Sequence, residues 1–161
     1  MMINFILNGQ DEMIETSAEH RLIDILKFNY HLIGAKTACY SGICGLCSVI
    51  FNGDIVKACL IPAFKIQGSE IITIEGFSQT HEYQDIVQGL MEGGTETCNY
   101  CDTGKILTIE ALLSKKPLPG SKDILAAFRG IKCRCTEPES LVQGVLAAAE
   151  TRQRRLYGRR S

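Results

Sequence analysis

Eight cysteines in two groups of four are the residues of this chain whose type and spacing could do chemistry. The first group is Cys39, Cys44, Cys47 and Cys59, and the second group is Cys98, Cys101, Cys133 and Cys135. Closely spaced thiols form disulfides, bind metal ions or hold iron–sulfur clusters. The first residues, MMINFILNGQ, lack the basic region and the long apolar run of a secretory signal, so we expect a cytoplasmic protein with reduced thiols. Two four-thiolate sites are therefore favoured over four disulfides.

The spacing of the first group narrows the chemistry. The stretch CYSGICGLC places Cys39, Cys44 and Cys47 as C-x4-C-x2-C, which is the plant-type arrangement for a 2Fe–2S cluster. A loop wrapped around a cluster turns sharply, and Gly42 and Gly45 can adopt the positive φ angles that such turns need. Backbone N–H groups of the loop can then point at the sulfur atoms. A zinc site is the alternative, although zinc motifs more often pair two C-x-x-C segments.

The second group combines C-x-x-C at Cys98 and Cys101 with C-x-C at Cys133 and Cys135. Taken alone, this pattern fits an iron–sulfur cluster or a zinc ion. A redox-active dithiol is a third reading of C-x-x-C, but no βαβ pattern surrounds it.

The elements that must position these thiols change type near residue 76. Before residue 76, the segments INFIL and MIETS on either side of Asn8-Gly9 predict one β-hairpin. The segments SVIFNG and DIVKACL predict a second hairpin with its turn at Asn52-Gly53, and EIITIEG predicts a further strand. Leu22, Ile25 and Leu26 mark one helix among these strands. After residue 76, the apolar period becomes 3.6 and predicts helices near 83–90, 106–113, 121–130 and 136–149. A compact α+β unit followed by an all-helical unit is the expected organisation.

Composition excludes several function classes. Net charge is −1 with 45% hydrophobic and 22% charged residues, which indicates a globular protein without a nucleic-acid or membrane partner. We find no paired carboxylates, no nucleophile beside a base and no phosphate-binding loop, so we predict no catalytic residue. The histidines show no ligand-like spacing. The tail TRQRRLYGRRS is expected to be a frayed, solvated end, or alternatively a contact with a partner subunit.

The segments CYSGICGLCSVIFNG, IITIEG and CRCT together resemble the iron–sulfur subunit of the molybdenum hydroxylases, from about residue 3 to residue 149. That family includes xanthine dehydrogenase, aldehyde oxidoreductase and carbon monoxide dehydrogenase. The resemblance implies an α+β fold: a plant-type ferredoxin-like β-grasp domain at 1–76 and a helical, four-helix-bundle-like domain at 77–161. It also implies that the two cysteine groups ligate two 2Fe–2S clusters.

The resemblance further implies two partners, a molybdopterin-binding large subunit and an FAD-binding subunit. Electrons would pass from the molybdenum centre through the helical-domain cluster and then the ferredoxin-like cluster to FAD. Two rival interpretations stay open at this point. One is a zinc-binding adaptor, and the other is a stand-alone ferredoxin-like electron carrier.

The chain departs from the family pattern around the second group while keeping all eight cysteines. Ala38 stands where glycine is common before the first ligand. Where the family usually has Gln-Cys-Gly-Phe-Cys-Thr-Pro-Gly, this chain reads Thr97-Cys98-Asn99-Tyr100-Cys101-Asp102-Thr103-Gly104, and Glu137-Pro138 replaces a Gly-Tyr pair. The replaced glutamine belongs to the region that touches the pterin in the family. We expect the second cluster to stay redox-active, with Asp102 and Glu137 lowering its potential and Lys105 and Arg134 able to raise it.

Overall fold

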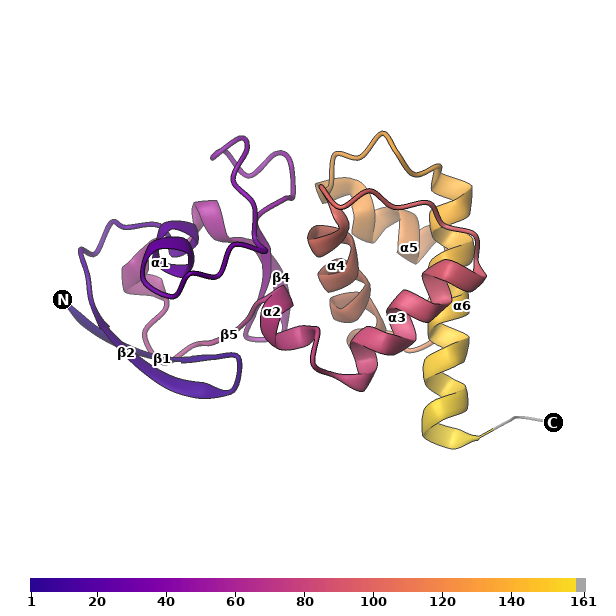
Figure 1. The fold of residues 1–161 in the computed structure, drawn as a ribbon, viewed down its shortest axis with the longest axis horizontal. Coiled ribbons are helices and arrows are strands. Elements are labelled where there is room, and N and C mark those ends of the chain that lie inside the picture. Colours follow the sequence, from indigo (N-terminus) through magenta and orange to yellow (C-terminus); the bar gives the residue numbers. More distant parts are fainter. Residues whose placement is uncertain (159–161) are drawn as a thin grey trace.

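The computed structural model describes residues 1–158 as a mixed β-sheet with a covering helix, followed by a group of helices (Figure 1). The strands are β1 (Met2–Leu7), β2 (Gln10–Glu15), β3 (Ser48–Phe51), β4 (Asp54–Lys57) and β5 (Glu70–Ile72). The α-helices are α1 (Leu22–Phe28), α2 (Ile74–Phe77), α3 (His81–Glu92), α4 (Asp102–Lys115), α5 (Ser121–Ala127) and α6 (Pro138–Tyr157). Short 3₁₀ helices are η1 (Ala58–Leu60), η2 (Ala63–Lys65) and η3 (Phe128–Gly130). The predicted α+β class is confirmed.

Two hairpins and one parallel pairing build the sheet, in the order β2-β1-β5-β3-β4. β1 pairs antiparallel with β2 across Asn8-Gly9, and β3 pairs antiparallel with β4 across Asn52-Gly53. All four turn residues have positive φ, as the predicted two-residue hairpins require. β5 lies between the hairpins, parallel to β1 and antiparallel to β3. The result is the β-grasp arrangement that we expected.

The first core forms between this sheet and α1. Alternate residues of β1, namely Ile3, Phe5 and Leu7, point inward and are buried. From α1, Leu22 and Leu26 are fully buried against them. The core thereby holds both ends of the long segment between α1 and β3, which carries the first three cysteines.

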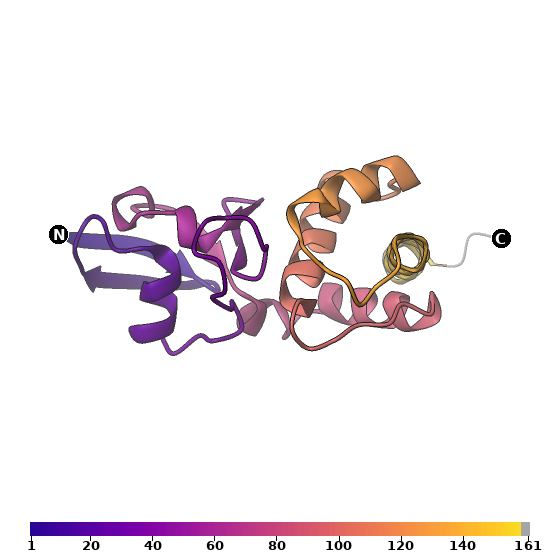
Figure 2. The same ribbon diagram turned by 90° about the horizontal axis from the view of Figure 1, so that it is seen from above.

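The second core joins the helices to the other part of the sheet. α4 packs against β3, and Ile50 of β3 is buried together with Leu107 of α4. Among the helices α3 to α6, Figure 2 shows α4 nearest to the sheet, and α6 seen end-on farther away. α3 and α6 approach so closely that a side chain at Gly89 would overlap the backbone of Ala148. The helical group therefore packs directly against the sheet through α4.

Two strand predictions were too long. The segment DIVKACL leaves the sheet after Lys57 and turns into η1, which contains Cys59. The segment EIITIEG is a strand only to Ile72 and then forms α2. Both corrections have the same cause, since apolar β-branched runs fit a buried helical turn as well as a strand.

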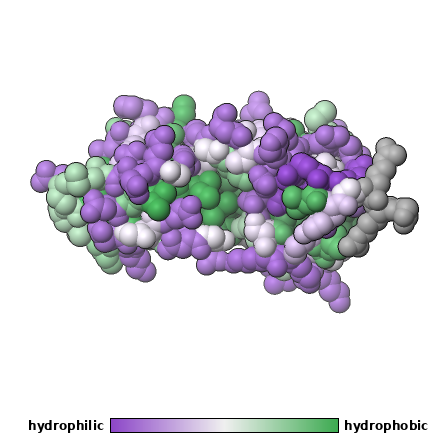
Figure 3. All heavy atoms as spheres, turned by 90° about the horizontal axis from the view of Figure 1, so that it is seen from below, coloured by the Kyte–Doolittle hydropathy of each residue, from purple (hydrophilic) through white to green (hydrophobic). Residues whose placement is uncertain are grey.

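The prediction of a frayed end is wrong for residues 151–157, because α6 continues to Tyr157. Arg152 is buried, and Arg155 donates to both carboxylate oxygens of Asp85 on α3. Arg159 and Arg160 of the same tail lie outside the described residues. None of the helices described between residues 1 and 158 has both the length and the apolar character to cross a membrane. Figure 3 shows the lower face of the molecule, where hydrophobic residues lie between hydrophilic ones in both halves.

Candidate metal centres

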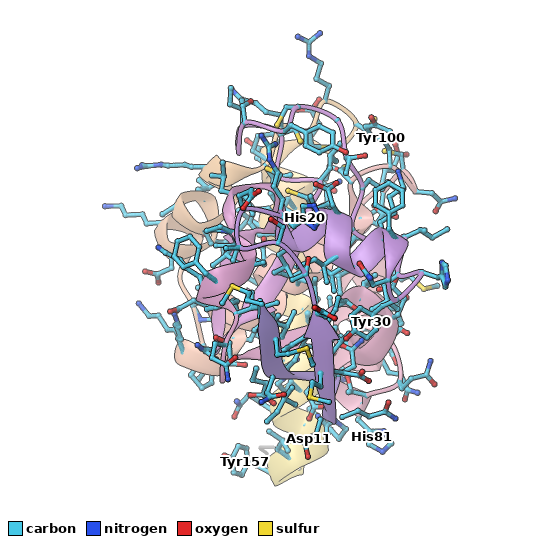
Figure 4. The ribbon with its side chains drawn as sticks, turned by 90° about the vertical axis from the view of Figure 1, so that its left-hand side faces the viewer. Asp11, His20, Tyr30, His81, Tyr100 and Tyr157 are labelled. Atoms are coloured by element: carbon cyan, nitrogen blue, oxygen red, sulfur yellow. The ribbon has the colours of Figure 1, made fainter. Side chains whose placement is uncertain are left out.

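Both cysteine groups lie in loops and turns at one edge of the molecule. The first group occupies the loop between α1 and β3, together with η1, and the second occupies the loops that precede α4 and α6. These loops rise to the upper edge in Figure 1, and Figure 4 shows Tyr100, beside Cys101, at that same edge. His81 lies toward the opposite edge in Figure 4. All eight cysteines are free thiols, so the disulfide alternative is wrong.

Glycine shapes the loop of the first group, as predicted. Gly42 and Gly45 have φ angles of 75° and 80°, which residues with a Cβ atom rarely adopt. Gly45 has a second reason to lack a side chain, because a Cβ atom there would lie 2.6 Å from the carbonyl oxygen of Gly130. The bare loop therefore turns sharply and also lets a distant segment approach its backbone.

The first group combines one outer thiol with a buried pair. The Ser41 N–H donates to Cys39 Sγ at 3.4 Å, and this bond, with further N–H groups of Cys44 and Ile43, lowers the pKa of Cys39 to about 5. Burial raises the pKa of Cys47 to about 11, and the neighbouring thiol of Cys59 contributes. Cys39 is thus favoured as a thiolate, whereas Cys47 must lose its proton on binding a metal.

The second group is brought together from segments more than thirty residues apart. Cys98 Sγ lies 4.0 Å from Cys101 Sγ, and Cys101 Sγ lies 3.4 Å from Cys133 Sγ. Cys135 contacts Cys98 through its side chain. Since α4 begins directly after Cys101, its N-terminal N–H groups and dipole favour negative charge at these thiols.

Individual thiols of this group differ in acidity. The N–H groups of Tyr100 and Cys101 lower the pKa of Cys98. Burial is the largest cause that raises the pKa of Cys101, to about 12. Burial also opposes ionisation of Cys133, but hydrogen bonds from the Cys135 N–H and other donors outweigh it and lower its pKa to about 7. Each quartet therefore contains an acidic thiol and a buried one.

The unusual neighbours of the second group differ in where they point. One carboxylate oxygen of Asp102 is buried without a hydrogen-bond partner, and burial raises its pKa. Glu137 is exposed at the N-cap of α6, and Thr97 and Arg134 are also exposed. Lys105, in contrast, is only 1% exposed. Of the charged residues singled out from the sequence, Asp102 and Lys105 are the two that the structure places in the interior beside the thiols.

The two cysteine loops are in direct contact. The backbone N–H of Lys132, which precedes Cys133, donates to the carbonyl oxygen of Cys44 at 3.1 Å. Lys36, close before Cys39, donates through Nζ to the backbone oxygens of Asn99 and Tyr100. A short path of covalent bonds and one hydrogen bond therefore joins a thiol of the second group to one of the first.

Sequence reasoning missed Lys36 and Lys57. Lys57 Nζ lies near Ser48 Oγ, at 3.3 Å, and would lie 3.2 Å from a Cβ atom at Gly130. Burial lowers the pKa of Lys57, and the thiols of Cys47 and Cys44 oppose that shift. No motif or spacing marks either lysine, because Lys36 contacts residues more than sixty positions away and Lys57 reaches Ser48 only through the pairing of β3 with β4.

The donor sets fit iron–sulfur clusters. Each group offers four free cysteine sulfurs, the number that a 2Fe–2S cluster requires. Backbone N–H groups already point at Cys39 and Cys98, which suits a group that gains negative charge on reduction. Within residues 1–158, no three His, Cys, Asp or Glu side chains are arranged as a site for a single metal ion.

Comparisons with known proteins give the same picture. Residues 5–69 match the family of 2Fe-2S iron–sulfur cluster binding domains, and residues 73–146 match the family of 2Fe-2S binding domains. The chain is 42% identical over 134 residues to the nicotinate dehydrogenase small FeS subunit of Eubacterium barkeri, covering 83% of this chain and 85% of that protein. It is 35% identical over 130 residues to a probable xanthine dehydrogenase subunit of Bacillus subtilis, covering 81% and 75%. The solved structure of quinoline 2-oxidoreductase from Pseudomonas putida 86 matches with a TM-score of 0.82 at 28% identity, covering 95% and 96%.

Proposed function

Because the chain belongs to the iron–sulfur subunits of the molybdenum hydroxylases, we propose that it is the electron-transfer subunit of an oxidoreductase complex. The observation that carries this proposal is the contact between its two cysteine loops, where Lys132 N–H meets the carbonyl oxygen of Cys44. A short bonded path between two redox sites is what an electron carrier needs. A stand-alone ferredoxin-like carrier would need only the first site.

The proposal assigns all eight cysteines as ligands. Cys39, Cys44, Cys47 and Cys59 would hold one 2Fe–2S cluster, and Cys98, Cys101, Cys133 and Cys135 would hold the other. It also keeps the division into domains at 1–76 and 77–161. Support for that division comes from the two family matches, since one match ends at residue 69 and the other begins at residue 73.

Each cluster, when bound, supplies a one-electron redox centre. The chain's own residues hold and shield it. N–H groups of the glycine-containing loop stabilise the Cys39 thiolate, and the buried positions of Cys47, Cys59 and Cys101 keep water from the inner ligands. The turns at Gly42 and Gly45 fix the loop in this shape. Lys36 and the Lys132–Cys44 hydrogen bond hold the two ligand loops next to each other.

The partners belong to the proposal as well. We place the substrate chemistry in a molybdopterin-binding large subunit and the final electron acceptor in an FAD-binding subunit, in a cytoplasmic complex. Support comes from relatives whose names describe them as subunits of nicotinate dehydrogenase and xanthine dehydrogenase. Co-purification of the native complex, followed by a substrate screen, tests this part. A chain that purifies alone from its native source and reduces external acceptors by itself would favour the stand-alone carrier.

Metal analysis tests the cluster assignment. Anaerobically purified protein should contain about four irons and four acid-labile sulfides per chain, because each 2Fe–2S cluster contributes two of each. Stoichiometric zinc without labile sulfide would instead support the zinc adaptor.

Reciprocal serine variants test the two ligand sets. Cys44→Ser should remove one electron paramagnetic resonance signal of the reduced protein and leave the other, and Cys98→Ser should do the reverse. Loss of both signals from either folded variant would contradict two independent sites.

A further inference from the structure

Lys105 is a buried cation beside the second cysteine group. It lies one helical turn after Cys101, and its backbone N–H donates to the Cys101 carbonyl oxygen at 3.1 Å. Only 1% of its surface is exposed, which is rare for a lysine. An ammonium group leaves water at a large free-energy cost, so its burial needs a compensating partner.

The partners of Lys105 are mostly neutral or sulfur groups. Nζ donates to Thr136 Oγ1 at 2.5 Å, and that hydroxyl donates to the carbonyl oxygen of Glu96 at 2.5 Å. The thiols of Cys101 and Cys133 also face the ammonium group. The nearby carboxylate is Asp102, three residues earlier on the same helix. Sulfur ligands that become negative are therefore an important part of what offsets the buried charge.

Two cavities flank the side chain of Lys105, which is itself almost completely buried. One, of about 170 Å³, is lined by Asp102, Leu90 and Lys105 among others. The other, of about 210 Å³, is lined by Phe128, Cys133 and Lys105 among others. Mobile ions screen a charge in such surroundings far less than a charge at the surface. A unit charge in this position therefore acts on the adjacent sulfur atoms more strongly than the same charge at the surface would.

We infer that Lys105 sets the reduction potential of the second centre, raising it above the value that a neutral residue at this position would allow. Reduction adds one negative charge to a group that Cys101 and Cys133 hold, and a buried cation against those sulfurs stabilises the reduced form more than the oxidised form. The inference rests on the proposed function, since it concerns one of the two proposed clusters. It names the residue that makes this site a better electron acceptor.

The test is a potentiometric titration of the holoprotein and of Lys105→Met, followed by electron paramagnetic resonance of the second centre. The signals are assigned with Cys44→Ser. At the wild-type midpoint potential, we expect the reduced-to-oxidised ratio of that centre to fall about tenfold in Lys105→Met, a shift of about 59 mV for a one-electron couple. The other centre should shift less.

Two variants separate charge from structure. Lys105→Arg keeps the charge, so it should keep a potential close to the wild-type value. Lys132→Met removes the same charge from an exposed residue next to Cys133, so its shift should be smaller and should vanish at high salt. If Lys105→Met does not assemble its second cluster, Lys105→Gln, which retains a donor toward Thr136, provides the same comparison.

The outcomes are distinguishable. An unchanged ratio in Lys105→Met or Lys105→Gln, with full iron and sulfide content, would overturn this inference and leave the electron-transfer function intact. Equal shifts in the methionine and arginine variants would also overturn it, because they would indicate a structural effect. Wild-type protein without either cluster would overturn the proposed function itself.

Discussion

Arg152 holds together three helices, and its replacement by methionine should markedly destabilise the protein. Its side chain on α6 is 8% exposed, and Nη2 donates to Glu110 Oε2 of α4 at 2.6 Å. Nε lies 3.7 Å from Asp85 Oδ2 of α3, whose side chain is 5% exposed. Methionine fills a similar volume but leaves the buried carboxylate of Asp85 and the partly buried carboxylate of Glu110 without this cation.

The contacts of Arg152 indicate how much unfolding free energy the Arg152→Met variant should lose. Removing one partner of a buried ion pair costs about 3–5 kcal/mol. Asp85 retains Arg155, which donates to it at 2.8–3.0 Å, but Glu110 retains only the Ser114 hydroxyl at 2.7 Å. Because one carboxylate stays compensated, we expect a loss near the lower end, about 3 kcal/mol. For a protein of this size, that corresponds to a fall in Tm of about 6–12 °C.

Arg154→Met is the matched control on the same helix. Its side chain is 54% exposed and lies 3.5 Å from Glu92, which is 43% exposed. Surface ion pairs contribute about 0–1 kcal/mol, so its Tm should fall by no more than about 4 °C. Adding Glu110→Gln to Arg152→Met should restore part of the stability, because it removes the uncompensated charge.

Far-ultraviolet circular dichroism of the holoproteins, heated at one common scan rate, measures these differences, and urea unfolding provides a second measurement. If Arg152→Met unfolds no earlier than Arg154→Met, the buried network does not stabilise the helical half and the reasoning fails. If Glu110→Gln worsens the Arg152→Met variant, the loss did not come from an unpaired carboxylate.

The remaining predictions concern the cysteine loops. Asp102→Thr should raise the potential of the second centre by tens of millivolts as an order of magnitude, and Glu137→Gly by less, because an oxygen of Asp102 is buried whereas Glu137 is exposed. Redox titration measures both, and a larger effect of Glu137→Gly would contradict the argument. In chain stripped of iron under native conditions, Cys39 should alkylate fastest at neutral pH, because its pKa of about 5 makes it a thiolate there, whereas Cys47, with its pKa raised to about 11, stays protonated. The alkylation rate of Cys39 should fall as the pH falls through about 5. Peptide mapping by mass spectrometry measures both rates, and a Cys47 labelled as fast as Cys39 would contradict this difference in thiol acidity.

The sequence by itself determined the local geometry and the chemistry of the ligands. The hairpins at Asn8-Gly9 and Asn52-Gly53 form as predicted, because positive φ is a property of the turn residues themselves. The sharp loop at Gly42 and Gly45 follows for the same reason. Cysteine spacing within such a short loop limits which groups the thiols can hold, so the cluster type was predictable from a few neighbouring residues.

Only the tertiary structure decided which distant segments contact one another and which side chains are buried. The turn at Cys59 could not be separated from a strand, since apolar runs suit both and packing makes the choice. The partners of Arg152 and Arg155 lie 42 and 70 residues away, so ion pairs that the sequence does not reveal anchor the last turns of α6 to α3 and α4. Lys105 is an ordinary helix residue in the sequence, and its burial against the thiols follows from segments that converge from both sides of it. Electrostatic effects depend on distance and solvent exposure, and the order of residues along the chain specifies neither.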